Sequence, residues 1–87
     1  MEKKIILVVQ EKELVFNMTG EIHNKFINEM HSPKSKVNSY HNLCMRAVDD
    51  ASKADLEEVL KLPSASLEIA STLIDEFTPE LNIRVGK

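Results

Sequence analysis

His41 and Cys44 are the residues of this chain best suited to chemistry, and they stand three positions apart in the stretch SYHNLCMR (39–46). A His-x-x-Cys pair can ligate zinc, and a histidine beside a thiol can activate it as a nucleophile. On a helix, Cys44 lies about 40° and His41 about 100° around the axis from Tyr40, which places Cys44 in the middle of an apolar stripe. A cysteine in such surroundings behaves as a small hydrophobe with a raised pKa. We therefore expect Cys44 to pack in the core.

The remaining polar residues do not supply an active site. His23 and His31 lie about 80° apart on their helix, so they would converge poorly on a metal. Neighbouring carboxylates on a helix point about 100° apart, which suits solvated faces better than an acid–base pair. The glycines, Gly20 and Gly86, are too few for a phosphate-binding loop. The sequence predicts no catalytic residue, no metal site and no cofactor, and an enzyme built on the His-x-x-Cys pair is the disfavoured alternative.

Composition excludes several classes of protein. Eighty-seven residues, 43% hydrophobic and 29% charged, indicate one small globular domain spanning 1–87. The net charge of −3 and the lack of a basic block argue against nucleic-acid binding. The longest apolar run, 5–9, is far shorter than the roughly 20 residues that cross a bilayer. That run is also too short for a signal-peptide core, and the single cysteine fits a reducing cytosol, so we expect a cytoplasmic protein.

Residues 3–18 read as a β-hairpin. Leu14, Phe16 and Met18 alternate with polar or smaller residues, as in a half-buried strand. The first run, 5–9, is apolar on both faces, which predicts a central strand with neighbours on both sides and cover on both faces. The connection around 10–13 has neither glycine nor asparagine, so we expect a loop longer than two residues.

Apolar residues spaced every three or four positions predict about four helices after the hairpin. Thr19, Ser52 and Ser64 are the expected N-caps of the first, third and fourth helices. Pro33, Pro63 and Pro79 separate or end these helices. The expected helix ranges are about 19–31, 38–50, 53–61 and 65–78.

A last strand is expected at about 81–86. Leu81, Ile83 and Val85 alternate there with Asn82 and Arg84. This strand could supply the second neighbour that a central first strand needs. The predicted fold is α+β: an N-terminal hairpin, about four helices, and a C-terminal strand that completes a three-stranded antiparallel sheet in the order second–first–last.

Four apolar residues are candidates for partner binding. Ile6 and Val8 exceed what a three-stranded sheet with one covered face can hide, and Met30 and Met45 add adaptable apolar area near helix edges. The alternative, that all four are core residues of a two-sided sheet, stays open. A short last strand also leaves an edge that another chain could extend, so self-association is a further expectation.

The landmarks KKIILVV, HNLCMRAV and LEEVLKLPSASLEIASTLIDEFTPELNIRVGK follow one another along the chain. In this order they resemble the small tail assembly chaperones of tailed phages and prophages of proteobacteria. The most specific parts are NLCMR, the Leu62-Pro63 break, and the ending from EF-x-P to VGK. The resemblance covers nearly the whole chain and brings no catalytic residue with it.

The resemblance implies a non-catalytic role in phage tail assembly. Such chaperones bind the tape measure protein and keep it soluble until tail-tube subunits polymerise around it, which makes the tail-tube protein a second candidate partner. They act in the host bacterial cytoplasm and are absent from the finished virion. Some are made in two lengths, and this chain would correspond to the shorter. The alternative is a phage-encoded adaptor or inhibitor that binds a host protein.

Overall fold

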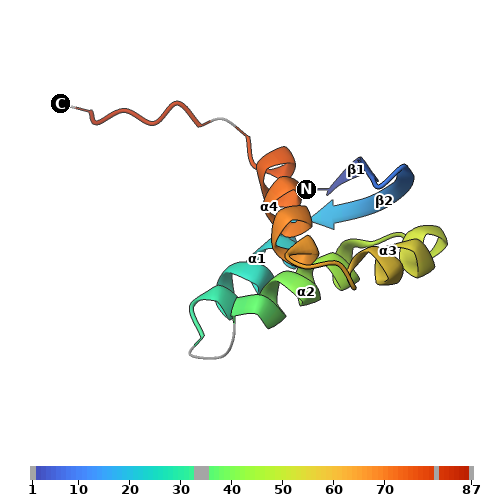
Figure 1. Ribbon diagram of the computed structural model, residues 1–87. Helices are drawn as coiled ribbons and strands as arrows, with labels where there is room; N and C mark the ends of the chain where they lie inside the picture. The colour runs from blue at the N-terminus through green and yellow to red at the C-terminus, as the bar shows by residue number, and fades with distance from the viewer. Residues whose placement is uncertain (1, 33–35, 80, 87) are drawn as a thin grey trace.

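A computed structural model describes residues 2–32, 36–79 and 81–86. An N-terminal hairpin of β1 (Glu2–Val9) and β2 (Lys12–Thr19) lies across a layer of helices (Figure 1). The elements that follow are α1 (Gly20–Met30), α2 (Lys36–Ala47), the 3-10 turn η1 (Asp50–Ser52), α3 (Lys53–Val59) and α4 (Ala65–Phe77). The predicted α+β class, with a hairpin followed by four α-helices, is confirmed.

The hairpin closes more tightly than the sequence indicates. Val9 pairs with Lys12, so the loop is only Gln10-Glu11, and the expectation of a longer loop is wrong. Both loop residues have positive φ, 52° and 66°, as a type I′ turn requires. Neither residue type favours this conformation. The strand register that buries one face of the hairpin therefore imposes this turn conformation, although Gln10 and Glu11 do not favour it.

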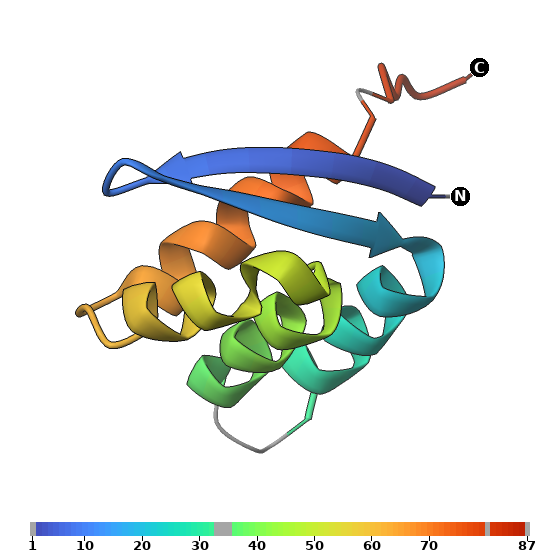
Figure 2. The ribbon, with the colours of Figure 1, turned by 90° about the vertical axis from the view of Figure 1, so that its right-hand side faces the viewer.

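One face of the hairpin forms the core with the helices beneath it (Figure 2). Leu14, Phe16 and Met18 of β2 are fully buried there, and Ile5 of β1 is nearly so. The helices contribute buried side chains from both ends of the layer: Phe26, Leu43, Cys44, Ala47, Leu56, Val59, Ile69, Ala70, Leu73 and Phe77. The predicted apolar stripe of the second helix is thus confirmed around Cys44.

Of the three predicted helix N-caps, the first is confirmed, whereas the other two stand at the N-cap position but make no side-chain cap. Thr19 caps α1, because its Oγ1 accepts a hydrogen bond from the Ile22 N–H at 3.1 Å. Ser52 makes no side-chain cap, since its Oγ accepts instead from the Val15 N–H of β2 at 2.9 Å. Ser64 also makes no side-chain cap and adopts a left-handed φ of 62°. The structure uses Ser52 to bind the hairpin rather than to start a helix.

The second helix ends at Ala47 instead of near Asp50, because the chain turns to cover the outer edge of β2. Val48 forms an isolated bridge with Phe16, and the Asp49 N–H donates to the Val15 carbonyl at 2.8 Å. The Asp49 carboxylate accepts from the Ala51 N–H at 3.1 Å and starts η1. Residues 48–52 therefore stand where another strand could otherwise pair with β2.

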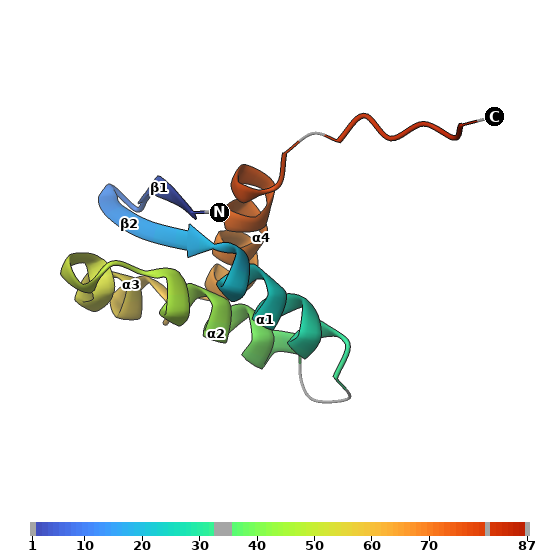
Figure 3. The same cartoon turned by 180° about the vertical axis from the view of Figure 1, so that it is seen from behind.

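The predicted third strand is wrong. The sheet has two strands, in the order β1–β2, and the C-terminal segment (Leu81–Gly86) forms no strand with it. Asn82 has a φ of 50°, which interrupts an extended backbone between Leu81 and Ile83. The segment leads away from the hairpin after α4 (Figure 1, Figure 3). Among residues 2–32, 36–79 and 81–86, β1 is consequently an edge strand rather than the expected central one, and no element covers one face of the hairpin.

Candidate partner-binding surface

The hairpin presents an apolar face to solvent. Strand alternation points Ile6 and Val8 away from the helices, with exposed fractions of 53% and 71%. Val15 lies opposite Ile6 and is half-buried, while Lys4 and Asn17 form a polar pair at one end. We call Ile6, Val8 and Val15 the outer face. The predicted site residues Ile6 and Val8 therefore lie together on one side of the molecule.

The two edges of the hairpin differ. A two-residue loop sets Val9 and Lys12 as a hydrogen-bonded pair, so the backbone groups of Lys4, Ile6 and Val8 point outward from β1. The corresponding outward groups of Val15 are engaged by residues 49–52. Within the ranges described, no other backbone segment pairs with the outward groups of β1. The β1 edge can therefore accept an extended chain.

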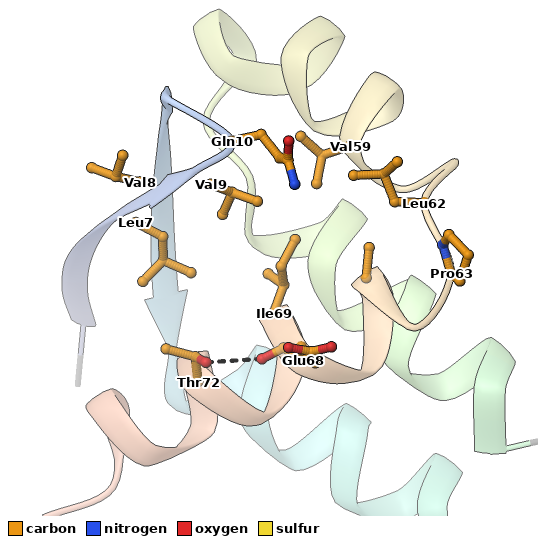
Figure 4. A pocket seen from close by; sticks show the side chains of 11 residues that line it. Leu7, Val8, Val9, Gln10, Val59, Leu62, Pro63, Glu68, Ile69 and Thr72 are labelled. Carbon is orange, nitrogen blue, oxygen red and sulfur yellow. Dashed lines mark hydrogen bonds between the residues drawn. The ribbon is translucent and has the colours of Figure 1, made fainter.

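A groove runs beside this edge, between β1 and α4 (Figure 4). It has a volume of about 500 Å³. Leu7 and Val9 point into it from β1, whereas the side chain of Val8, which also lines the groove, points to the other side of the strand (Figure 4). We call it the β1–α4 groove, and its main apolar residues are Leu7, Val9, Val59, Leu62, Ala65 and Ile69.

The polar residues of the β1–α4 groove are few. Gln10, Glu68 and Thr72 line it, and the Thr72 hydroxyl is used internally, donating to the Glu68 carbonyl at 2.8 Å. Glu68 is exposed and is the one ionisable side chain among the described lining residues. The groove thus combines an apolar floor with a single negative charge, a lining suited to an apolar ligand with a basic or neutral flank.

Sequence reasoning did not find this groove. One wall comes from the end of β1 and the other from the end of α3, the connection after it and α4, and about 50 to 65 positions of sequence separate the two walls. The Leu62-Pro63 break indicates a helix boundary and a landmark of the family resemblance, and in the structure both residues line the groove. The sequence does contain one signal for the groove. Leu62 is an apolar residue directly before a helix-breaking proline and lies outside any helical stripe.

Met30 and Met45 lie elsewhere. Both are half-buried and pack against the core, Met30 at the end of α1 and Met45 within α2. The helix layer lies under the opposite face of the hairpin from Ile6 and Val8 (Figure 2). The structure therefore separates the four predicted residues into an outer-face pair and a helical pair.

The His41 and Cys44 pair has the geometry of packing rather than of chemistry. Cys44 is fully buried, its Sγ lies 3.8 Å from the Ser66 carbonyl oxygen, and burial raises the pKa of its thiol to about 12. His41 is exposed on α2. Among the described residues, no three His, Cys, Asp or Glu side chains gather where they could hold a metal ion. A thiol that stays protonated at neutral pH is a poor nucleophile.

In the part of the chain that the structure covers, no helix has the length and apolar character needed to traverse a bilayer.

Comparison with curated proteins gave no match, and comparison with solved structures gave none either. A family model did match, over residues 5–87, and its description is phage tail assembly chaperone. This match includes β1 from Ile5 onward, all of β2, all four α-helices and the C-terminal segment. The chain therefore belongs to the phage tail assembly chaperone family.

Proposed function

We propose that this chaperone binds the tape measure protein of its phage and keeps that protein soluble until tail-tube subunits polymerise around it. The tail-tube protein would be a second, later partner. The protein would act in the cytoplasm of the host bacterium and be absent from the finished virion. Membership of the family supports a chaperone role in tail assembly. The open apolar surface of the hairpin supports a client with apolar segments.

The observation that carries this proposal is the exposure of Ile6 and Val8 on a sheet face that no described element covers. Isoleucine and valine in a strand normally pack against a second layer. An amphipathic helix of a client could lie across this outer face, with its apolar stripe on Ile6 and Val8. The polar residues at the ends of the outer face, the pair Lys4 and Asn17 at one end and Glu13 opposite Val8 at the other, would then remain in water.

The size of the outer face predicts weak individual contacts. Covering an exposed aliphatic side chain contributes about 1–2 kcal/mol, and the outer face offers two exposed side chains of this kind, Ile6 and Val8. Weak contacts suit a client that tube subunits must later displace. Several copies bound along one long client would raise the overall affinity without tightening any one contact.

Met30 and Met45 would form a second, separate contact. Their flexible side chains are half-buried at the helix layer, so a client segment could displace part of their packing. This contact would engage a different segment of the client from the one on the outer face. Its contribution is expected to be smaller, because less of each side chain is available.

Co-expression with the tape measure protein encoded in the same tail gene cluster tests the proposal. The wild-type chain should keep the tape measure protein in the soluble fraction and co-purify with it. The double variant Ile6→Asp, Val8→Asp should lose most of that effect. A matched control, Ile27→Asp with Leu67→Asp, places the same charges at exposed apolar positions on α1 and α4 and should retain it.

Circular dichroism of each variant would verify that the fold is intact before solubility is compared. An insoluble tape measure protein in the presence of well-expressed wild-type chain would contradict the proposal and favour the host-protein adaptor instead. Equal rescue by the outer-face variant and the control would contradict the assignment to Ile6 and Val8.

A further inference from the structure

The C-terminal segment (Leu81–Gly86) is an apolar strand-like sequence that pairs with no strand in the described part of the chain. Leu81, Ile83 and Val85 have exposed fractions of 64%, 81% and 99%. They alternate with Asn82 and Arg84, so one side of the segment would be apolar if it were fully extended. The described residues of the segment form no hydrogen-bonded pair with the sheet. Three exposed aliphatic side chains in six residues are a feature that association with another surface would explain.

The β1 edge offers what such a segment needs, namely unpaired backbone groups beside an apolar groove. Its outward backbone groups at Lys4, Ile6 and Val8 lack a paired strand among the described residues, and the β1–α4 groove runs directly beside them. A strand added at this edge would point alternate side chains, spaced by about 6.6 Å, to the groove side of the sheet. Leu7 and Val9 already point to that side, so the added apolar residues would continue the same layer.

The overall charge of the two parts is compatible with this pairing. The segment from α3 through α4, Lys53–Phe77, carries six acidic and two basic side chains, a net charge of −4. Glu68 brings part of that charge to the groove itself. The C-terminal segment carries Arg84 and no acidic residue between 81 and 86. With Leu81, Ile83 and Val85 toward the groove, Arg84 would point to the side of the sheet that Lys4 occupies, away from Glu68. Charge therefore contributes only through the overall attraction between a basic segment and an acidic helix layer.

We propose that the C-terminal segment of one copy adds as a strand to the β1 edge of a second copy, with Leu81, Ile83 and Val85 over the β1–α4 groove. Within one chain the segment leads away from the hairpin (Figure 1, Figure 3), which places it where a second molecule can receive it. Asn82 would adopt an extended conformation on docking, a change that asparagine makes at little cost.

The geometry of this contact predicts open assembly. Donor and acceptor lie at different places on the same molecule, so the contact is head-to-tail and can repeat from copy to copy. A six-residue strand buries less than the roughly 1,200 Å² of a standard interface, so the association should be weak and reversible. This inference goes beyond client binding and stands independently of it.

Analytical ultracentrifugation of the full chain over a range of about 5 to 500 µM tests the inference. The weight-average mass should rise with concentration beyond that of a dimer. Ile83→Asp should weaken self-association at least tenfold, because a carboxylate would enter the apolar groove. Asn82→Asp, with the same added charge one residue away on the other side of the strand, should change it less than threefold.

A second matched pair tests the acceptor. Leu62 and Leu67 have nearly equal exposed fractions, 43% and 42%, but only Leu62 lines the groove. Leu62→Asp should therefore weaken self-association at least tenfold, whereas Leu67→Asp should leave it close to wild type. Circular dichroism would establish that both variants are folded.

Mixing the two defective variants gives the sharpest result. The Leu62→Asp chain keeps an intact C-terminal segment, and the Ile83→Asp chain keeps an intact groove. Each alone should be monomeric, and their mixture should form a 1:1 heterodimer that grows no further. A wild-type chain that is monomeric throughout the range would overturn the inference, as would a mixture that stays monomeric. Self-association unaffected by Ile83→Asp would overturn it too, by showing a different interface.

Discussion

Cys44 shows how the position of a single residue decides its chemistry. It lies in the buried stripe of α2, where the loss of hydration raises the pKa of its thiol to about 12. At pH 8 a group with that pKa stays almost entirely protonated. Packing, rather than nucleophilic or metal chemistry, is therefore the contribution of Cys44 to this chaperone.

We expect native Cys44 to react with an aromatic disulfide reagent at pH 8 at least about 100-fold more slowly than the same cysteine in the unfolded chain. Burial both blocks access to the sulfur and keeps it protonated. Absorbance of the released thiol in buffer and in concentrated urea would measure the two rates. Because Cys44 is the single cysteine, Cys44→Ala is a complete control. Fast reaction of the native protein would contradict the buried assignment.

At the scale of elements, the β1–β2 turn and the α1–α2 contact show two ways in which the fold is held. The turn is a locally unfavourable conformation, imposed by the register of the strands. The helix contact includes a favourable charged pair, in which the Arg46 guanidinium donates to both Glu29 oxygens at 3.2 and 3.0 Å. Each can be tested separately.

Glu11→Gly should stabilise the protein by about 0.5–1 kcal/mol. Glu11 has a φ of 66°, which glycine adopts without the steric cost of a Cβ. Glu13→Gly is the matched control, because Glu13 lies in extended β2, where glycine should destabilise. Urea unfolding followed by circular dichroism would measure both. A destabilising effect at position 11 would contradict the imposed-turn interpretation.

The Arg46–Glu29 pair should make stability depend on pH. The hydrogen bond from Arg46 is the main cause that holds the pKa of Glu29 below its usual range. The stabilisation is therefore present above about pH 4.5, the ordinary value for the unfolded chain, and is lost as the pH falls through the lower folded pKa.

Arg46→Met should reduce the free energy of unfolding by about 0.5–1 kcal/mol at pH 7, a modest loss because the pair is partly exposed. At a pH well below the folded pKa the variant and wild type should be equally stable. Urea titrations at both pH values would measure this. Lys61→Met removes a fully exposed pair and should leave the unfolding midpoint unchanged. An equal loss for Arg46→Met at both pH values would show that packing, not charge, is responsible.

At the scale of the whole molecule, one core joins the hairpin to all four α-helices, while the C-terminal segment stands apart from it. The candidate binding surfaces exist because the C-terminal segment does not join the sheet. The outer face, the β1 edge and the β1–α4 groove all exist because the sheet stops at two strands. A third strand in the same chain would have removed the edge.

Deletion of residues 80–87 should change the free energy of unfolding by less than about 0.5 kcal/mol at low micromolar concentration, because the described residues of the C-terminal segment contribute nothing to the core. The same deletion should abolish the rise of mass with concentration. Thermal unfolding and ultracentrifugation would measure the two effects. A large loss of stability in the dilute monomer would show that the segment packs on its own chain.

The sequence by itself determined the elements whose patterns are local. Alternation in β2, the apolar stripe around Cys44 and the hydroxyl of Thr19 each act within a few residues, so the hairpin, the buried cysteine and the cap of α1 were predictable. The family resemblance was equally a property of the sequence, and the match over 5–87 confirms it.

Only the tertiary structure decided how those elements pair. Alternation in 81–86 predicted a strand, but alternation does not specify which edge a segment pairs with, and the described residues of this segment lead away from the hairpin. The local sequence predicted Ser52 as a helix N-cap, but its hydroxyl accepts a hydrogen bond from the distant backbone N–H of Val15 instead. The β1–α4 groove joins residues about 50 positions apart. The local pattern of a segment indicates which of its side chains can be buried. Which segments pair with one another depends on long-range geometry. The candidate binding surfaces depend on that pairing, so the sequence alone does not predict them.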